Sequence, residues 1–300
     1  MGCDVMVIGC RGQLGRDLME SFAEDHAVVG VDIEECDIRD REQVLKTVSE
    51  AAPRVALHAA AYTDVDACES NPNLAMAVNG DGAGHVALAC REVGARMVYF
   101  STDYVFDGAL DRPYTEDDPT NPRTVYGQSK LAGEEAVRTA LDDYVILRIA
   151  WLYGRHGRNF VKTMIDLGRR QTQARGERQP WSPLRVVNNQ FGTPCWTEDI
   201  ARQTRAVLSE HVTGLFHATS EGETSWYEFA RELFASLGWD VAVEPCLTAE
   251  FPRPAVRPRR STLENARLKS AGLNVMPDWR SSLTLFLNEY REELIGERQD

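Results

Sequence analysis

The sequence lacks the features that mark membrane, disulfide-rich and nucleic-acid-binding proteins. No apolar run in its 300 residues approaches the roughly 20 residues that a transmembrane helix needs. Its seven cysteines are odd in number, scattered and never arranged as C-x-x-C, which argues against a disulfide framework or a zinc site. Its formal charge of −13 argues against a nucleic-acid-binding surface. We therefore expect a soluble cytoplasmic protein without a nucleic-acid or membrane partner.

Strand and helix patterns alternate through the first half of the chain. Apolar strand patterns cover residues 4–8, 27–31, 55–58, 97–100 and 144–148, with helix patterns between them. This alternation is typical of an α/β fold with a doubly wound, Rossmann-like parallel sheet. The pattern changes after Gly154. We predict a dinucleotide-binding domain over 1–154, with 185–212 returning to it, and a smaller C-terminal substrate-binding domain over 155–184 and 213–300. A loop is predicted over 171–181.

The first strand runs directly into a glycine-rich turn and a helix. Three glycines at spacing G-x-x-G-x-x-G let a backbone approach a pyrophosphate, and the helix N-terminus supplies N–H donors. The spacing departs from the general G-x-G-x-x-G pattern, but the flanking strand and helix are in the right order. The residues predicted to bind a dinucleotide here are Gly9, Arg11, Gly12, Gln13, Leu14 and Gly15.

The choice between NADPH and NADH stays open. Asp32, at the end of the second strand, suits a ribose 2′-hydroxyl and disfavours a 2′-phosphate, whereas Arg11 could pair with that phosphate. Asp37, beside Ile38, could accept from the adenine amino group or cap the next helix. Small residues after the third strand suit a backbone that lies against a flat cofactor, and they are Ala59, Ala60 and Ala61.

Tyr126 and Lys130 stand four residues apart on one predicted helix face. A Lys ammonium on that face would lower the phenol pKa from about 10 towards neutrality. Such a phenol can exchange a proton with a carbonyl or alkoxide oxygen. Asn79, in an earlier helix, could bind a backbone carbonyl or simply face solvent.

Motifs along nearly the whole chain resemble the extended short-chain dehydrogenases, and among them the dTDP-4-dehydrorhamnose reductase family. In the first half the similar segments are residues 9–15, 60–66, 101–108 and 126–130. In the second half they are residues 151–154, 190–194, 225–230 and 254–263.

The resemblance implies a catalytic triad of Thr102, Tyr126 and Lys130. It implies hydride transfer from NADPH or NADH to C4 of dTDP-4-dehydro-6-deoxy-L-mannose, a nucleotide sugar, to give dTDP-L-rhamnose. Arg257 is the candidate for the substrate diphosphate, because residues 252–260 concentrate four arginines in an acidic chain. The predicted substrate-binding residues are therefore Thr102, Asp103, Tyr104, Trp151, Asn159 and Arg257.

Two departures from the family affect the expected metal and substrate contacts. Some members bind magnesium at a dimer contact through acidic residues, one near the glycine loop. Gln13 stands at that loop position here, so no metal site is expected. The chain is then a monomer or a homodimer. Asn189 stands where members often carry aspartate.

Two alternative functions share these motifs. A sugar-nucleotide dehydratase or epimerase would keep Tyr126 and Lys130, but dehydratases resemble Thr-Asp-Glu where this chain has Tyr104 after Asp103. Tyr104 has no carboxylate to take the C5 proton. The second alternative is a non-catalytic regulatory subunit that resembles the methionine adenosyltransferase beta subunit.

Overall fold

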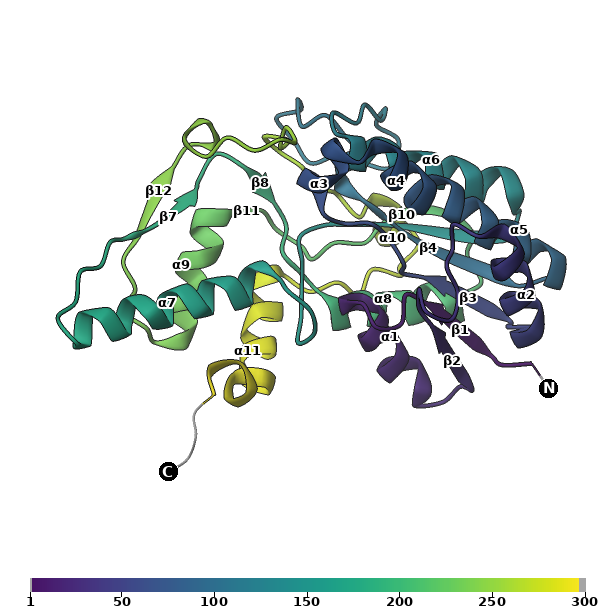
Figure 1. The fold of residues 1–300 in the computed structure, drawn as a ribbon, viewed down its shortest axis with the longest axis horizontal. Helices are drawn as coiled ribbons and strands as arrows, with labels where there is room; N and C mark the ends of the chain where they lie inside the picture. Colours follow the sequence, from purple (N-terminus) through teal and green to yellow (C-terminus); the bar gives the residue numbers. More distant parts are fainter. Residues whose placement is uncertain (1, 297–300) are drawn as a thin grey trace.

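The computed structural model describes residues 2–296 and is built on a six-stranded parallel sheet (Figure 1). The strand order is β10-β5-β4-β3-β1-β2. The strands are β1 (Val5–Ile8), β2 (Val28–Val31), β3 (Val55–His58), β4 (Arg96–Thr102), β5 (Tyr144–Ile149) and β10 (Gly214–His217). Every neighbouring pair is parallel, which confirms the predicted Rossmann-like fold. Residue 1 and residues 297–300, at the outer ends of the predicted domains, lie outside the described residues.

Helices cover both faces of the sheet, as Figure 1 shows. One face packs on α2 (Arg41–Ala51), α5 (Gly82–Val93) and α6 (Val125–Ala140), through apolar residues such as Val48, Val86 and Val137. The other packs on α1 (Gln13–Ala23) and α8 (Thr197–Ser209), with the short α10 (Ala266–Ser270) beside them. Both faces are therefore buried, which explains why the strands read as continuous apolar runs.

A second lobe packs around its own apolar cluster, which includes Phe229, Trp279 and Phe286. Its helices are α7 (Phe160–Gly176), α9 (Trp226–Leu237) and α11 (Trp279–Ile295). Its strands are β7 (Leu184–Val187) beside β12 (Val243–Cys246), and β8 (Phe191–Gly192) beside β11 (Thr224–Ser225). The pair β6 (Leu152–Tyr153) and β9 (Cys195–Trp196) lies where the chain passes between sheet and lobe. No helix within residues 2–296 is long and apolar enough to cross a membrane.

The strand pairing corrects two predicted domain boundaries. β10 pairs with β5 in the central sheet, although residues 213–300 were assigned to the substrate domain. β7 pairs with β12 in the second lobe, so residues 185–187 do not return to the first domain. The predicted loop over 171–181 is also wrong in part, because α7 continues to Gly176. Polar residues on the exposed face of α7 gave that segment its loop-like composition.

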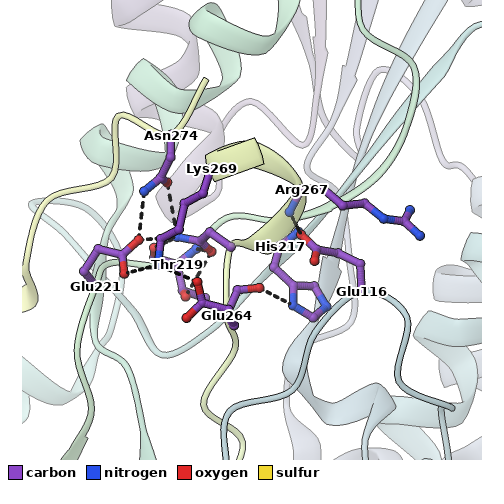
Figure 2. Close-up of polar contacts among 9 residues, drawn as sticks. Glu116, His217, Thr219, Glu221, Glu264, Arg267, Lys269 and Asn274 are labelled. Atoms are coloured by element: carbon purple, nitrogen blue, oxygen red, sulfur yellow. Dashed lines mark hydrogen bonds and ion pairs between the residues drawn. The ribbon is translucent and has the colours of Figure 1, made fainter. Parts of the chain in front are cut away.

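A polar network fastens the segment after β10 to the region around α10 (Figure 2). Glu221 accepts from Asn274 Nδ2 and from Lys269 Nζ, each at 2.8 Å. The His217 Nδ1 lies 3.1 Å from the Glu264 carbonyl oxygen. Because a carbonyl can only accept, His217 Nδ1 carries the proton and Nε2 is the acceptor. The network fixes the residues that connect the central sheet to the second lobe.

Candidate active site

The turn between β1 and α1 can only be built with glycine at two positions. Gly9 has a φ of +85°, and a Cβ there would lie 2.5 Å from the Ala60 nitrogen. A Cβ on Gly15 would lie 2.0 Å from the Gly9 oxygen. Gly12, the N-cap of α1, offers no side-chain hydrogen bond to the first turn. The first N–H groups of α1 therefore need another acceptor, as in helices that bind phosphate.

Two cavities meet at the carboxyl ends of the strands. One, of about 390 Å³, is lined by predicted cofactor residues, namely Gly9, Gly12, Asp32, Asp37, Ile38 and Ala59 to Ala61. The other, of about 450 Å³, is lined by Gly12, Gln13, Leu14, Gly15, Ala59, Ala61, Thr102, Asp103, Tyr104, Tyr126, Lys130 and Trp151. They share Gly12, Ala59 and Ala61, so they lie next to each other. The structure thus brings together most residues predicted from distant sequence segments.

The first two turns of α6 place Tyr126 and Lys130 in the second cavity. Thr124 caps the helix by accepting from the Gly127 N–H at 3.0 Å. Lys130 is 2% exposed, and its Nζ lies 4.1 Å from the centroid of the Tyr99 ring. The ammonium therefore sits over an aromatic face inside the protein rather than in water.

Burial controls the protonation of both side chains. It raises the pKa of Tyr126 above its ordinary value, an effect that Thr102 opposes and Asp103 reinforces. Burial lowers the pKa of Lys130 to about 7, and the Glu134 charge opposes this. The predicted fall of the phenol pKa is therefore wrong in this structure, because desolvation penalises the phenolate more than its neighbours stabilise it. Tyr126 is a neutral phenol at physiological pH.

The end of β4 presents a hydroxyl and a carboxyl to the same cavity. The Thr102 hydroxyl donates to Asp103 Oδ1 at 3.0 Å and accepts from the Tyr104 N–H at 3.2 Å. Asp103 is 2% exposed, and burial raises its pKa to about 6. The Tyr104 ring meets Tyr126 edge-on at a centroid distance of 5.7 Å. Polar and aromatic groups thus converge around the Tyr126 hydroxyl.

Asn79 lies in η1 (Met76–Asp81), a π-helical segment between α4 (Pro72–Ala75) and α5, and is buried. It accepts from the Tyr62 N–H at 2.8 Å and donates to the Tyr62 carbonyl at 3.0 Å. It also donates to Ser129 Oγ at 3.0 Å. Of the two alternatives for Asn79, the backbone contact is confirmed and solvent exposure is wrong. The side chain joins the segment after β3 to the helix that carries Tyr126.

Two tryptophans form one wall of the second cavity. The Trp151 and Trp226 rings stack with centroids 3.5 Å apart and planes 8° apart. Trp151 has a φ of +42°, which is strained for a residue with a side chain. A Cβ on Gly192 would lie 2.4 Å from the Trp151 ring, so that glycine makes room for it. Trp226 is not among the predicted site residues, although it lies in the segment 225–230 that resembles the reductase family.

At the adenosine end, Arg11 does not line either cavity. The Arg11 guanidinium pairs with Glu34 and Glu35. The Arg11 backbone N–H donates to Asp32 Oδ2 at 2.8 Å. Arg39 does line the first cavity and pairs with Asp37. Either arginine would have to exchange a carboxylate for a phosphate before it could bind a ribose 2′-phosphate.

At the substrate end, Asn159 and Arg257 are held by other protein groups. Asn159 caps α7 and donates to Gln13 Oε1 and the Gly154 carbonyl, each at 2.9 Å. Arg257 Nη2 donates to Asp66 Oδ2 at 3.0 Å, while its Nη1 is buried without a hydrogen-bond partner. Neither residue lines the second cavity, whereas Arg158 does. The predicted substrate contacts of Asn159 and Arg257 stay predictions.

One cluster of potential metal ligands lies between α1 and the loop after β6. The ligand atoms of Asp17, Glu20 and His156 lie within 4.8 Å of one another. The expectation of no metal site rests on Gln13 and does not extend to this cluster. That prediction stays untested, since exposed acidic groups such as Glu20 often gather without an ion.

Comparisons with known proteins agree with this geometry. The sequence profile of the family described as the RmlD substrate binding domain matches residues 3–292. A dTDP-4-dehydrorhamnose reductase of Streptomyces griseus is 44% identical, with 93% of this chain and 91% of the relative covered. A dTDP-4-keto-6-deoxy-D-glucose reductase of Streptomyces niveus is 39% identical, with 93% and 94% covered.

A solved structure shares the whole fold. The dTDP-4-dehydrorhamnose reductase of Bacillus anthracis strain Ames, solved in complex with NADP, superposes with a TM-score of 0.91. It is 37% identical, and the match covers 96% of this chain and 100% of that one. The chain therefore belongs to the RmlD substrate binding domain family, together with these dTDP-4-dehydrorhamnose reductases.

Proposed function

We propose that this protein is an NAD(P)H-dependent oxidoreductase that reduces the C4 ketone of dTDP-4-dehydrorhamnose to give dTDP-L-rhamnose. One observation carries the proposal. Tyr126, Lys130 and Thr102 converge in the second cavity, which shares lining residues with the first cavity beside the glycine turn. The family and its named reductases support the substrate class.

The residues present fit a dinucleotide. The Gly9 turn leaves no room for a Cβ, the N–H groups at the start of α1 suit a pyrophosphate, and Asp32 suits a ribose hydroxyl. Bound NADPH or NADH would supply the hydride. The residues that would hold it are Gly9, Arg11 to Gly15, Asp32, Asp37, Ile38, Ala59 to Ala61, Tyr126 and Lys130.

The protein's own groups would handle the proton and the developing charge. Tyr126 is protonated at neutral pH and can give its proton to the oxygen that becomes an alkoxide at C4. The Thr102 hydroxyl would bind the same oxygen. Lys130, one helical turn along α6, would stabilise the phenolate that the transfer leaves behind.

The substrate would lie between the two lobes. The stacked pair Trp151 and Trp226 offers an apolar face for the sugar ring, and Asp103 and Tyr104 line the same cavity. Arg257, with an unpartnered Nη1, would bind the diphosphate. Asn159 would act through Gln13 and through α7, the helix that it caps.

We place the enzyme in the cytoplasm, because all seven cysteines are free thiols. The expectation of a monomer or a homodimer stays a prediction.

The test is cofactor oxidation with freshly prepared dTDP-4-dehydrorhamnose, with the product identified by NMR. We expect one cofactor oxidised per ketone reduced and dTDP-L-rhamnose as the product. dTDP-4-keto-6-deoxy-D-glucose is the matched comparison, because a relative is named for its reduction. Faster turnover of that sugar would reassign the substrate. Loss of water or epimerisation without net oxidation would contradict the proposal.

A further inference from the structure

A buried carboxylate lies one helical turn beyond Lys130 on the same face of α6. Glu134 is 0% exposed. Its oxygens accept from Arg148 Nε and Nη2, each at 2.8 Å, from Ser101 Oγ at 2.5 Å and from Arg138 Nη2 at 3.0 Å. Tyr126, Lys130 and Glu134 recur at intervals of four residues, so they follow one stripe of the helix. Nothing in the reaction proposed above uses Glu134.

Arg148, on β5, is fixed from its other side. It is 2% exposed, and its guanidinium lies 5.0 Å from the Phe106 ring centroid. Its Nη1 donates towards His217 Nε2 at 3.5 Å. His217 is neutral, because burial and the charge of Arg148 lower its pKa to about 3. Its Nδ1–H donates to the backbone carbonyl of Glu264 (Figure 2). The polar network after β10 therefore supports the ion pair from behind.

The groups around Lys130 come from three elements. Tyr126 and Glu134 face it from α6, and Tyr99 faces it from β4. His58, from β3, is neutral because burial lowers its pKa to about 3, and Asp103 lies across the cavity. Glu134 supplies the charge that raises the Lys130 pKa against the effect of burial. Without it, the buried ammonium would face neutral rings, and the Asp103 carboxyl across the cavity would be its remaining counter-charge.

We propose that Glu134 is a positioning residue for the reduction. Its buried carboxylate keeps Lys130 charged beside Tyr126 and, through Ser101, holds the Thr102 end of β4 against α6. The role in reduction rests on the proposed function, whereas the effect on the charge of Lys130 can be measured without substrate or cofactor. Removing one partner of a buried ion pair leaves the charge of the other uncompensated. Replacing Glu134 should therefore have a large effect on the charged groups around it.

The direct test is competitive acylation across a pH series, read at each lysine by peptide mass spectrometry. The chain has only four lysines, at positions 46, 130, 162 and 269, and the Lys46 side chain, 74% exposed, is the internal reference. Only the neutral amine reacts, so the midpoint of labelling reports the pKa. Glu134→Gln should lower the Lys130 midpoint by about one pH unit, because the opposite charge one helical turn away is lost.

Two matched variants separate charge from packing. Glu134→Asp keeps the charge and should leave the midpoint within about 0.3 units. Arg138 is the exposed partner of Glu134, and the Arg138 side chain is 42% exposed. Arg138→Gln should also leave the Lys130 midpoint within about 0.3 units. In the reductase assay, the basic limb of the kcat/KM profile should follow the Lys130 midpoint in each variant. A structural role alone would lower the rate at every pH without moving that limb.

A second variant covers loss of folding in Glu134→Gln. The double change Glu134→Gln with Arg148→Met replaces the ion pair by neutral groups, a change that buried pairs often tolerate. Its Lys130 midpoint should fall in the same direction, by about half a unit. A midpoint unchanged in either folded variant overturns the proposal, whatever the activity. A shifted midpoint with no reductase activity in the wild type would overturn the proposed function and leave the Glu134–Lys130 coupling intact.

Discussion

Arg257→Ala tests how the diphosphate of the substrate is bound. The guanidinium donates through Nη2 to Asp66 Oδ2 at 3.0 Å, and its Nη1 is buried without a partner. The second lobe thereby presents an oriented donor towards the first. A protein with a formal charge of −13 needs a positive group to receive a dianion, and the planar guanidinium can bind two phosphate oxygens at once.

The expected magnitude follows from these contacts. A hydrogen bond to a charged group contributes about 1.5–3 kcal/mol. Its loss corresponds to roughly a ten- to hundredfold rise in the substrate KM. The pair with Asp66 is partly exposed, with side-chain exposures of 20% and 25%, so its loss should cost no more than about 1 kcal/mol of stability. The variant should therefore fold.

The assay is initial-rate kinetics with the nucleotide sugar and the cofactor varied separately. The cofactor KM should not change. Arg259→Ala is the matched control, because that side chain is 74% exposed and lies 3.7 Å from Asp111. Arg260 would be a poor control, since it pairs with Glu223 at 3.0 Å. A substrate KM within about twofold of wild type would refute the reasoning, and Arg158, which lines the cavity, would then be the candidate.

Three further predictions concern single side chains. Tyr126→Phe should leave cofactor affinity nearly unchanged and lower kcat at least about a hundredfold, because the proton donor is lost; a kcat above a third of wild type would exclude that role. We expect both cofactors to work, with a modest preference for NADPH. Arg11→Ala should raise the KM for NADPH and hardly change that for NADH, and equal changes would mean that Arg11 only holds the turn. Asp103→Asn should raise the free energy of unfolding at pH 8 by on the order of 2 kcal/mol, measured by urea denaturation. The pKa of Asp103 is about 6 in the folded state, above its ordinary 3.8, so the folded state binds more protons between these values and loses stability as pH rises through them. The gain should disappear by about pH 4, and an equal gain at both pH values would exclude ionisation as the cause.

The local pattern of the sequence was enough to predict the fold and the residues around the glycine turn, whereas Thr102, Asp103, Tyr104 and Trp151 were implied by the family resemblance. The glycine turn depends on neighbours in the chain, and it forms between β1 and α1 as expected. The carboxyl ends of parallel strands meet at one edge, so the small residues after β3 could be placed beside the glycine turn without coordinates.

What the sequence could not predict depends on burial and on distant partners. The spacing of Tyr126 and Lys130 suggested a lowered phenol pKa, but desolvation of both groups reverses that effect. The Glu134–Arg148 pair joins α6 to β5, and no local pattern distinguishes it from a solvated pair. The sequence suggests Arg11 as a phosphate ligand, but in the structure its guanidinium pairs with Glu34 and Glu35.

The most direct test of the central claim is the fate of the transferred hydrogen. Reduced cofactor with deuterium at the transferred position of the nicotinamide is incubated with dTDP-4-dehydrorhamnose, and the product is examined by NMR. The account predicts dTDP-L-rhamnose with deuterium at C4 and one oxidised cofactor per product. Product without deuterium at C4, or product formed with no net oxidation of the cofactor, would contradict it.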